Sequence, residues 1–383
     1  MAKKTNCLVR GVPKYRINPV IDTVDGNSVR KNFYGSCKAE AEDKFKLFLV
    51  DYKKRKTLDG STTVGALMHE WIYNVERVNI GTKGSSFDRY EGIYRNYLKD
   101  SPVAKKKLVD IVSMDVQKYY NRLYDCNKTS SQIRNAHKVF RKFFRYCVDQ
   151  DYLIKSPCSG VVIPGDKGNL DDDDDEITIF TETEILLIYK EITDNRLRFL
   201  VKLALGTGLR LGELLALTYA DIKDGTVIVN KTLSEYSEIG ADAKRTKVIR
   251  DQAPKSKKGV RKVPLPAVLN KELTRHHLTQ KKEQLKSLVW EKSDYMFTTN
   301  TGKRLSESNI RKSWKLILSN CGIPYKKFHS LRHSYISNLV NSGVPLTWVQ
   351  ELAGHSRIEM TAKYAHTTLG DKRLAIDKII NRR

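Results

Sequence analysis

The order of apolar and polar positions predicts strands at the start of the chain and helices after them. Residues 15–24 and 29–34 are strand-like, and Asp25-Gly26 between them is a strong hairpin signal. Apolar residues then return at helical spacing. We therefore expect a small β-rich module with one helix over residues 1–57.

Between residues 61 and 160 the apolar positions recur with helical periodicity. Four such stripes are separated by short polar turns, which predicts a compact four-helix domain. The last stripe consists of Ile133, Ala136, Phe140, Phe143, Phe144 and Cys147. The same segment carries the basic residues Arg134, Lys138, Arg141, Lys142 and Arg145. That basic face could follow a phosphate backbone or simply face water.

A run of five aspartates, Asp171 to Asp175, interrupts the helical pattern. Like charges at this density repel one another, so we predict an extended acidic linker over residues 161–177. A capping-box sequence at Thr181 to Glu184 then begins a region that is mainly helical. A strand at residues 226–229 and a turn that leads into a strand at residues 255–265 interrupt that region. The last expected domain is thus mainly α with a small antiparallel sheet, over residues 178–383.

The charge balance indicates what kind of partner the protein binds. The 383 residues contain 69 Lys and Arg against 44 Asp and Glu, which gives a net charge of +25. Such an excess indicates a polyanionic partner, with nucleic acid first and an anionic membrane surface second. No run of about 18 apolar residues occurs, and no apolar segment follows the N-terminal Met-Ala-Lys-Lys. Neither a transmembrane helix nor a secretory signal is expected.

Cysteine usage and the absent motifs narrow the chemistry. The six cysteines are scattered without a Cys-x-x-Cys pair, which argues against disulfides and a zinc ribbon and favours a reducing cytoplasm. No P-loop occurs, and the glycines of residues 206–212 have the wrong spacing for a dinucleotide site. His329 and His333 are spaced to share a metal, but no third ligand is evident nearby. We expect no cofactor and no metal.

Three segments combine cations, histidines and a late tyrosine. They are TGLRLGELLAL, HSLRHSYISNLV and LAGHSRIEMTAKYAH, which contain Arg210, His329, Arg332, His355 and Tyr364. In this order and spacing they resemble the tyrosine recombinase (phage-type integrase) family. The three-module layout is most similar to that of integrases of conjugative transposons.

The resemblance implies a DNA recombinase that works through a 3′-phosphotyrosyl intermediate. Tyr364 would attack the phosphodiester, and Arg210 and Arg332 would hold its oxygens, a task that suits the planar, permanently charged guanidinium. His329 would take the tyrosine proton or hold the phosphate, and His355 would donate to a non-bridging oxygen. The expected function is integration and excision of a mobile element, either a conjugative transposon or a prophage.

The family also uses a lysine on a β-hairpin as the general acid. The segment that begins at Lys255 resembles the family pattern K-[TS]…R…V-P-L, with Arg261 in the arginine position. By that spacing Lys255 is the predicted acid. Lys257 is a strong competitor and Lys258 a weaker one.

The resemblance also implies how the modules divide the work. The helical domain would be a SAM-like core-binding domain, and the N-terminal module would bind arm-type sites on double-stranded DNA. Four protomers would assemble on two duplexes by exchanging the C-terminal tail, which carries Leu374, Ile376, Ile379 and Ile380. An accessory excision factor is a further possible partner, and no membrane partner is expected. Two alternatives stay open: a type IB topoisomerase, and a DNA-binding factor that has lost catalysis.

Overall fold

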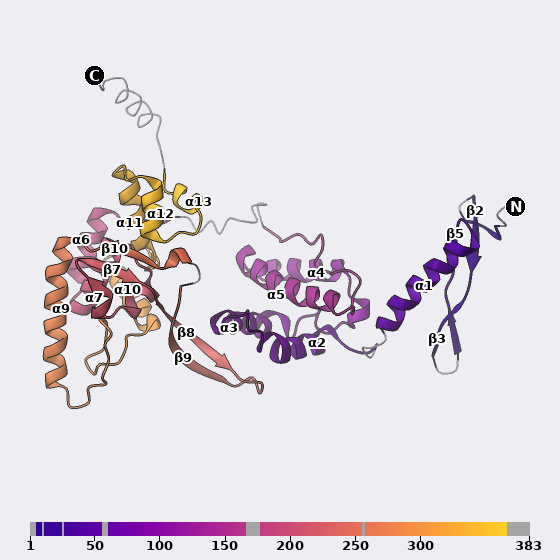
Figure 1. The fold of residues 1–383 in the computed structure, drawn as a ribbon, viewed down its shortest axis with the longest axis horizontal. Coiled ribbons are helices and arrows are strands. Elements are labelled where there is room, and N and C mark those ends of the chain that lie inside the picture. Colours follow the sequence, from indigo (N-terminus) through magenta and orange to yellow (C-terminus); the bar gives the residue numbers. More distant parts are fainter. Residues whose placement is uncertain are drawn as a thin grey trace, which may run out of the picture. The chain divides into compact units, whose positions relative to one another are not determined.

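A computed structural model describes residues 5–9, 11–24, 27–55, 60–165, 177–254 and 257–365 (Figure 1). The chain divides into two compact units. The first comprises Met1–Asp171 and Glu238–Arg245, and the second comprises Asp172–Ser237 and Thr246–Arg383. Within the described ranges, no helix is both long and apolar enough to cross a membrane. The predicted aspartate run and the predicted C-terminal tail lie outside the described residues.

The N-terminal part of the first unit is rich in β-structure, as predicted. Its elements are β1 (Cys7–Val9), β2 (Val12–Ile17), β3 (Val20–Val24), β4 (Asn27–Arg30), β5 (Phe33–Gly35) and α1 (Lys38–Arg55). β1, β2 and β5 form one antiparallel sheet, while β3 and β4 form a separate antiparallel hairpin. Phe33 joins sheet to helix, because its ring lies 5.4 Å from that of Phe45 and 5.1 Å from that of Phe48.

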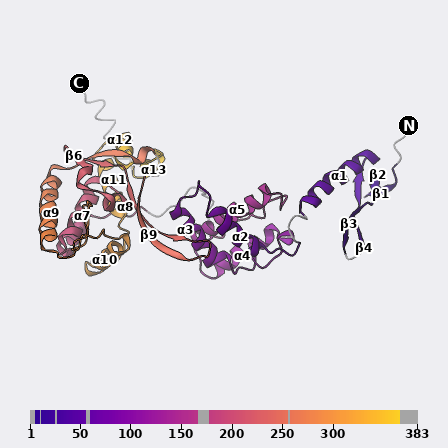
Figure 2. The ribbon, with the colours of Figure 1, turned by 60° about the horizontal axis from the view of Figure 1, so that its bottom comes forward.

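Residues 60–165 of the first unit are mainly helical. Its helices are α2 (Val64–Glu70), η1 (Trp71–Glu76), α3 (Gly84–Ile93), η2 (Tyr94–Leu98), η3 (Leu108–Asp110), α4 (Ser113–Asp125) and α5 (Ser130–Asp149). Figures 1 and 2 show α2 to α5 gathered around one core. All six residues of the predicted α5 stripe are buried in that core. Lys142, from the predicted basic face, is instead paired with the buried carboxylate of Glu76.

The second unit is mainly helical and contains two small sheets. Its helices are α6 (Glu182–Glu191), α7 (Asn195–Thr207), α8 (Leu211–Ala216), η4 (Tyr219–Asp221), η5 (Lys257–Gly259), α9 (Ala267–Lys286), α10 (Glu307–Asn320), α11 (Ser330–Asn341), α12 (Leu346–Ala353) and α13 (Glu359–Ala362). Its strands are β6 (Ile222–Lys223), β7 (Thr226–Val229), β8 (Thr232–Ile239), β9 (Arg245–Gln252) and β10 (Arg261–Pro264), of which the last two residues of β8 and the first residue of β9 belong to the first unit. The sheet order is β10-β7-β6, and β8 pairs with β9. The mainly α fold with small antiparallel sheets agrees with the sequence-based expectation.

Local sequence explains where this unit begins and how its sheet is placed. The Thr181 side chain accepts from the backbone N–H of Glu184 at 3.2 Å, and the Glu184 carboxylate accepts from the N–H of Thr181 at 2.8 Å, so the predicted capping box starts α6. Val227, Val229 and Val263 are fully or almost fully buried in the sheet. Their burial fixes β10, and with it the residues just before Arg261, against the helical core.

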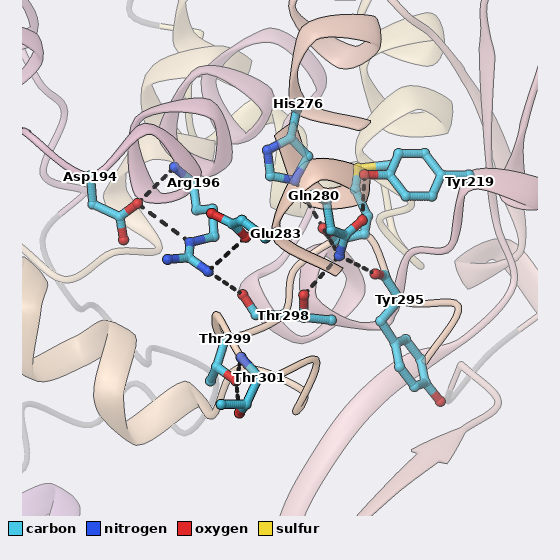
Figure 3. Close-up of polar contacts among 11 residues, drawn as sticks. Asp194, Arg196, Tyr219, His276, Gln280, Glu283, Tyr295, Thr298, Thr299 and Thr301 are labelled. Atoms are coloured by element: carbon cyan, nitrogen blue, oxygen red, sulfur yellow. Dashed lines mark hydrogen bonds and ion pairs between the residues drawn. The ribbon is translucent and has the colours of Figure 1, made fainter. Parts of the chain in front are cut away.

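A polar network supports α9 (Figure 3). Arg196, at the start of α7, donates to Glu283 and to the carbonyl of Thr298, both at 3.4 Å. Gln280 donates to the Thr298 hydroxyl at 2.7 Å and accepts from the Tyr219 hydroxyl at 2.8 Å. These bonds fasten the start of α7 and the loop at residues 295–301 to one helix.

Candidate active site

The turn between α7 and α8 positions the first predicted arginine. Gly208 ends α7 in the left-handed region, with φ of +64°. A Cβ there would lie 2.2 Å from a ring carbon of Tyr335, so glycine alone fits both the conformation and the space. Arg210 follows as the N-cap of α8, and its side chain is 39% exposed. The turn therefore leaves a guanidinium accessible at a helix start.

Glu213 joins Arg210 to a second, buried arginine. Arg210 donates from its backbone N–H at 2.9 Å and from Nη1 at 3.0 Å to the Glu213 carboxylate. Arg261 on β10 donates to both oxygens of the same carboxylate, at 3.1 and 2.8 Å. Burial opposes ionisation of Glu213, but the hydrogen bonds and charge of Arg261 and the charge of Arg210 outweigh it and lower the pKa to about 2. The ionised carboxylate fixes the direction of Arg210.

Arg261 also holds β10 against the end of α12. Its Nε donates to the carbonyl of Leu352 at 2.8 Å. Close approach requires Gly354, which has φ of +67° and whose added Cβ would lie 3.0 Å from Cδ of Arg261. Just before β10, Lys258 Nζ donates to the carbonyl of Ser356 at 3.2 Å. Lys258 is thereby attached to the loop that carries His355.

Arg332 on α11 is the second predicted arginine and is only 2% exposed. Its Nη1 donates to the carbonyl of Gly208 at 2.7 Å, and its Nη2 donates to the carbonyl of Ala353. Burial and the charge of Arg210 lower the pKa of Arg332. A guanidinium nevertheless stays protonated at any working pH. A fixed positive charge therefore lies where the ends of α7 and α12 meet α11.

Two predicted histidines lie within the field of these arginines. His355 follows α12, is 5% exposed, and its Nδ1 lies 2.9 Å from the Thr361 hydroxyl. Burial, followed by the charges of Arg332 and Arg210, lowers the pKa of His355 to about 3. His329, at the start of α11, is more exposed, yet loss of solvation around its ring and the neighbouring positive charges also lower its pKa. Both imidazoles are neutral near pH 7 in the free protein.

Tyr364 follows α13 and is 5% exposed. α11, α12 and α13 pack together at the yellow end of the ribbon in Figure 1. The Tyr364 hydroxyl is hydrogen-bonded to Nδ1 of His333, and its ring stacks on that of His355 with 6.5 Å between centroids. Burial raises the pKa of Tyr364, and the charge of Arg332 partly offsets this. The hydroxyl is therefore protonated near neutral pH, and its hydrogen-bond partner is a histidine ring nitrogen.

Five predicted site residues are brought together, although up to 154 positions separate them in the sequence. Arg332 acts electrostatically on Arg210 and Tyr364, and both arginines and His329 act on His355. Lys255, the predicted general acid, lies outside the described residues. Its assignment stays a prediction.

Two residues of the site were not expected from the sequence. His333 was noticed only for its spacing from His329, and their rings do meet, at 4.8 Å between centroids. Its contact with Tyr364 has no sequence signal other than that shared helix face. Arg261 was recognised as part of a motif, but nothing in the sequence links it to Glu213, which lies 48 positions earlier.

The side chains of the site carry an excess of positive charge. Three guanidiniums, those of Arg210, Arg261 and Arg332, act on the single carboxylate of Glu213. The positive excess and the neutral imidazoles are suited to a phosphate group, whose charge would raise the histidine pKa values and favour hydrogen-bond donation. In the ranges that the structure describes, no three His, Cys, Asp or Glu side chains form a metal-binding group.

The sequence is similar to those of known proteins. Residues 178–369 match the model of the phage integrase family. The chain is 38% identical to a "Tyrosine recombinase XerC-like" protein of Caldanaerobacter subterraneus subsp. tengcongensis over 390 residues, which cover 99% of each chain.

Two solved structures are similar in fold. One is a Tn1549 transposon integrase fragment in complex with transposon right end DNA, with a TM-score of 0.67, 20% identity, and coverage of 83% of this chain and 100% of that one. The other is a lambda integrase tetramer bound to a Holliday junction, with a TM-score of 0.58, 17% identity, and coverage of 87% and 89%. At these identities the likeness concerns the fold alone.

Proposed function

Because this chain belongs to the phage integrase family and is a tyrosine-type site-specific recombinase, we propose that it integrates and excises a mobile element. It would cleave and rejoin DNA through a 3′-phosphotyrosyl intermediate on Tyr364. The element would be a conjugative transposon or a prophage. One observation carries the proposal: a buried tyrosine lies in the field of Arg332, and its ring stacks on that of His355, on which Arg210 also acts.

Tyr364 is the proposed nucleophile. Its attack on phosphorus forms the Oη–P bond and breaks the bond to the deoxyribose 5′-oxygen. A phosphotyrosyl ester has an energy similar to that of the diester it replaces, so the reverse step rejoins the strand without ATP. The exchange conserves the bond energy that religation needs.

Arg210 and Arg332 are the proposed phosphate ligands. Negative charge grows on the non-bridging oxygens in the transition state, and fixed donors stabilise it best when they need not reorganise. Arg332 is held by two carbonyls and Arg210 by Glu213, so both guanidiniums are preorganised. Loss of either should cost about 3 kcal/mol of transition-state stabilisation, by analogy with one oxyanion-hole donor. His355 and His329 would donate once the bound phosphate raises their pKa values.

A lysine of the segment before β10 is the proposed general acid, and Lys255 is the first choice. Lys258, three positions after Lys255 in the sequence, contacts the carbonyl of Ser356, the residue that follows His355. Several positive charges nearby would lower the pKa of such a lysine toward neutrality. Protonation of the 5′-oxygen would then accompany bond cleavage.

The proposed partner is double-stranded DNA, bound at core and arm sites, with four protomers on two duplexes. The net charge of +25 and the tetrameric Holliday-junction complex of the lambda integrase support this. Tail exchange and an accessory excision factor belong to the same proposal. Contacts to many phosphates should make the affinity fall about tenfold per tenfold increase in salt for each phosphate neutralised.

A suicide DNA substrate tests the nucleophile. A nicked core site should trap the wild type as a covalent adduct, and peptide mapping should find the DNA on Tyr364. Tyr364→Phe should bind the same site and form no adduct, while the control Tyr325→Phe, at a tyrosine that is 57% exposed, should react like the wild type. An adduct formed by Tyr364→Phe, or one mapped elsewhere, would overturn the proposal.

A further inference from the structure

The hydroxyl of Tyr364 is hydrogen-bonded to a ring nitrogen of His333. We propose that His333 is a further catalytic residue of the strand-cleavage step, which takes the hydroxyl proton of Tyr364 on its Nδ1 as the tyrosine attacks. The proposal rests on Tyr364 being the nucleophile. Its primary observation is geometric: Tyr364 Oη is hydrogen-bonded to His333 Nδ1, and the two rings lie 5.8 Å apart at 32°.

Helical geometry explains why one helix supplies both the phosphate ligand and the proton acceptor. Arg332 and His333 are neighbours on α11, so their side chains leave the helix about 100° apart. Arg332 extends to the carbonyls of Gly208 and Ala353, while His333 extends to Tyr364. A single helix, α11, therefore fixes the position of the phosphate ligand Arg332 relative to the proton acceptor His333.

The other two histidines have different contacts. Nδ1 of His355 faces the Thr361 hydroxyl, and the ring of His329 meets the edge of His333. The groups around His333 include His329 from its own helix, Tyr364 from the segment after α13, and His355 from the loop after α12. The pKa values of His329 and His355 are both lowered, so these two stay neutral in the free protein near pH 7.

The need for an acceptor follows from the state of the tyrosine. Burial raises the pKa of Tyr364, so the hydroxyl is a poor nucleophile unless its proton leaves during the attack. Imidazole gains and loses protons near neutral pH and is suited to that transfer. For Nδ1 to accept, the neutral ring must carry its proton on Nε2.

The step balances. The Oη–P bond forms as the Oη–H bond breaks, and the proton goes to His333 Nδ1. The P–O5′ bond breaks with its electron pair on the 5′-oxygen, which receives a proton from the general-acid lysine. The protein ends with one more proton on histidine and one fewer on lysine, and religation by the 5′-hydroxyl reverses both transfers.

Substitution by asparagine separates positioning from proton transfer. In His333→Asn an amide oxygen replaces Nδ1 as acceptor but cannot take up the proton. With the full-length protein and the nicked suicide substrate, we expect the single-turnover rate of adduct formation to fall by about 10²- to 10⁴-fold. Binding of the same DNA should change little, which checks folding, and His333→Gln provides a second variant.

The pH profile and a modified tyrosine give readouts that a structural role would not change. The wild-type rate should fall about tenfold per pH unit on the acid side, because a protonated imidazole accepts no proton. Above that limb the wild-type rate should level off, whereas in His333→Asn the plateau should vanish and the rate should keep rising with hydroxide concentration through the neutral range. Difluorotyrosine at position 364, which is more acidic, should rescue His333→Asn by at least about tenfold and the wild type far less.

A matched histidine provides the control. His277 on α9 also packs against a tyrosine, with its ring 4.0 Å from that of Tyr219, and His277→Asn should react like the wild type. A wild-type rate and pH profile in His333→Asn, with the adduct on Tyr364, would overturn this inference alone. Loss of rate without rescue by difluorotyrosine would also overturn it. A wild type that forms no adduct on Tyr364 would overturn the proposed function together with this inference.

Discussion

Glutamine in place of Glu213 should destabilise the second unit by about 3 to 5 kcal/mol. Glu213 and Arg261 are an ion pair with side chains 5% and 3% exposed, so solvent screens it little. The variant leaves the guanidinium of Arg261 buried without its counter-charge. The pKa of Glu213, lowered from 4.5 to about 2, gives a consistent magnitude of about 3 kcal/mol at 1.36 kcal/mol per pKa unit.

The same pKa fixes how the effect depends on pH. Since the folded-state pKa lies below the unfolded value of 4.5, folding favours the ionised carboxylate. Its contribution is complete well above pH 4.5 and is lost as the pH falls toward 2. The difference in unfolding free energy between the wild type and Glu213→Gln should therefore narrow by roughly 1 kcal/mol between about pH 7 and about pH 3.5.

Urea unfolding of the full chain, followed through the emission of the buried Trp314, measures this difference. A Trp71→Phe background in both proteins removes the buried tryptophan of the helical domain. Glu307→Gln is the control, because its partner Arg311 is 63% exposed and such a surface pair contributes less than about 1 kcal/mol. A loss below about 1 kcal/mol for Glu213→Gln, or a difference that does not narrow in acid, would refute the reasoning.

Three further outcomes are expected. Gly208→Ala should lower the unfolding free energy by about 3 kcal/mol or more, because a side chain there is strained by the left-handed backbone and also clashes with the ring of Tyr335. Gly343→Ala, with φ of +78° and open space around it, should lower the unfolding free energy by only about 1 kcal/mol, and equal losses in urea unfolding would contradict this reasoning. Arg332→Lys should slow adduct formation by about 10²- to 10³-fold in single-turnover assays, because an ammonium group cannot reproduce the guanidinium's contacts with the carbonyls of Gly208 and Ala353. An unchanged rate would contradict the proposed role of Arg332 as a phosphate ligand. Of Lys255→Met and Lys257→Met, a 5′-phosphorothiolate substrate should rescue the first, since its sulfur leaving group needs no acid; rescue of only the second would move the assignment to Lys257.

Local patterns predicted elements well where short-range physics decides them. The capping box at Thr181 starts α6, and the apolar stripe of α5 is buried in full. The strand predicted at 226–229 is β7. In each case the deciding interactions lie within one or two helical turns or along one strand, so the sequence contains them directly. The β-rich start and the mainly helical second unit are confirmed for the same reason.

Local patterns could not predict interactions between segments that are far apart in the sequence. Nothing local indicates that Lys142 is paired with Glu76 instead of belonging to an open basic face. In the same way, the positive φ of Gly208 is a local property, but the ring of Tyr335 that forbids a side chain there comes from another helix. Only packing of the helices brings such groups within contact distance.

The sequence by itself determined the family, because three motifs in a fixed order contain Arg210, Arg332, His329, His355 and Tyr364. The tertiary structure decided how these side chains are held. It placed Glu213 between two arginines and brought His333, instead of His329, to the hydroxyl of Tyr364. Motif spacing follows the chain, whereas charge compensation and proton acceptance depend on distances in space, and those are set by how α8, α11 and β10 pack on a common core.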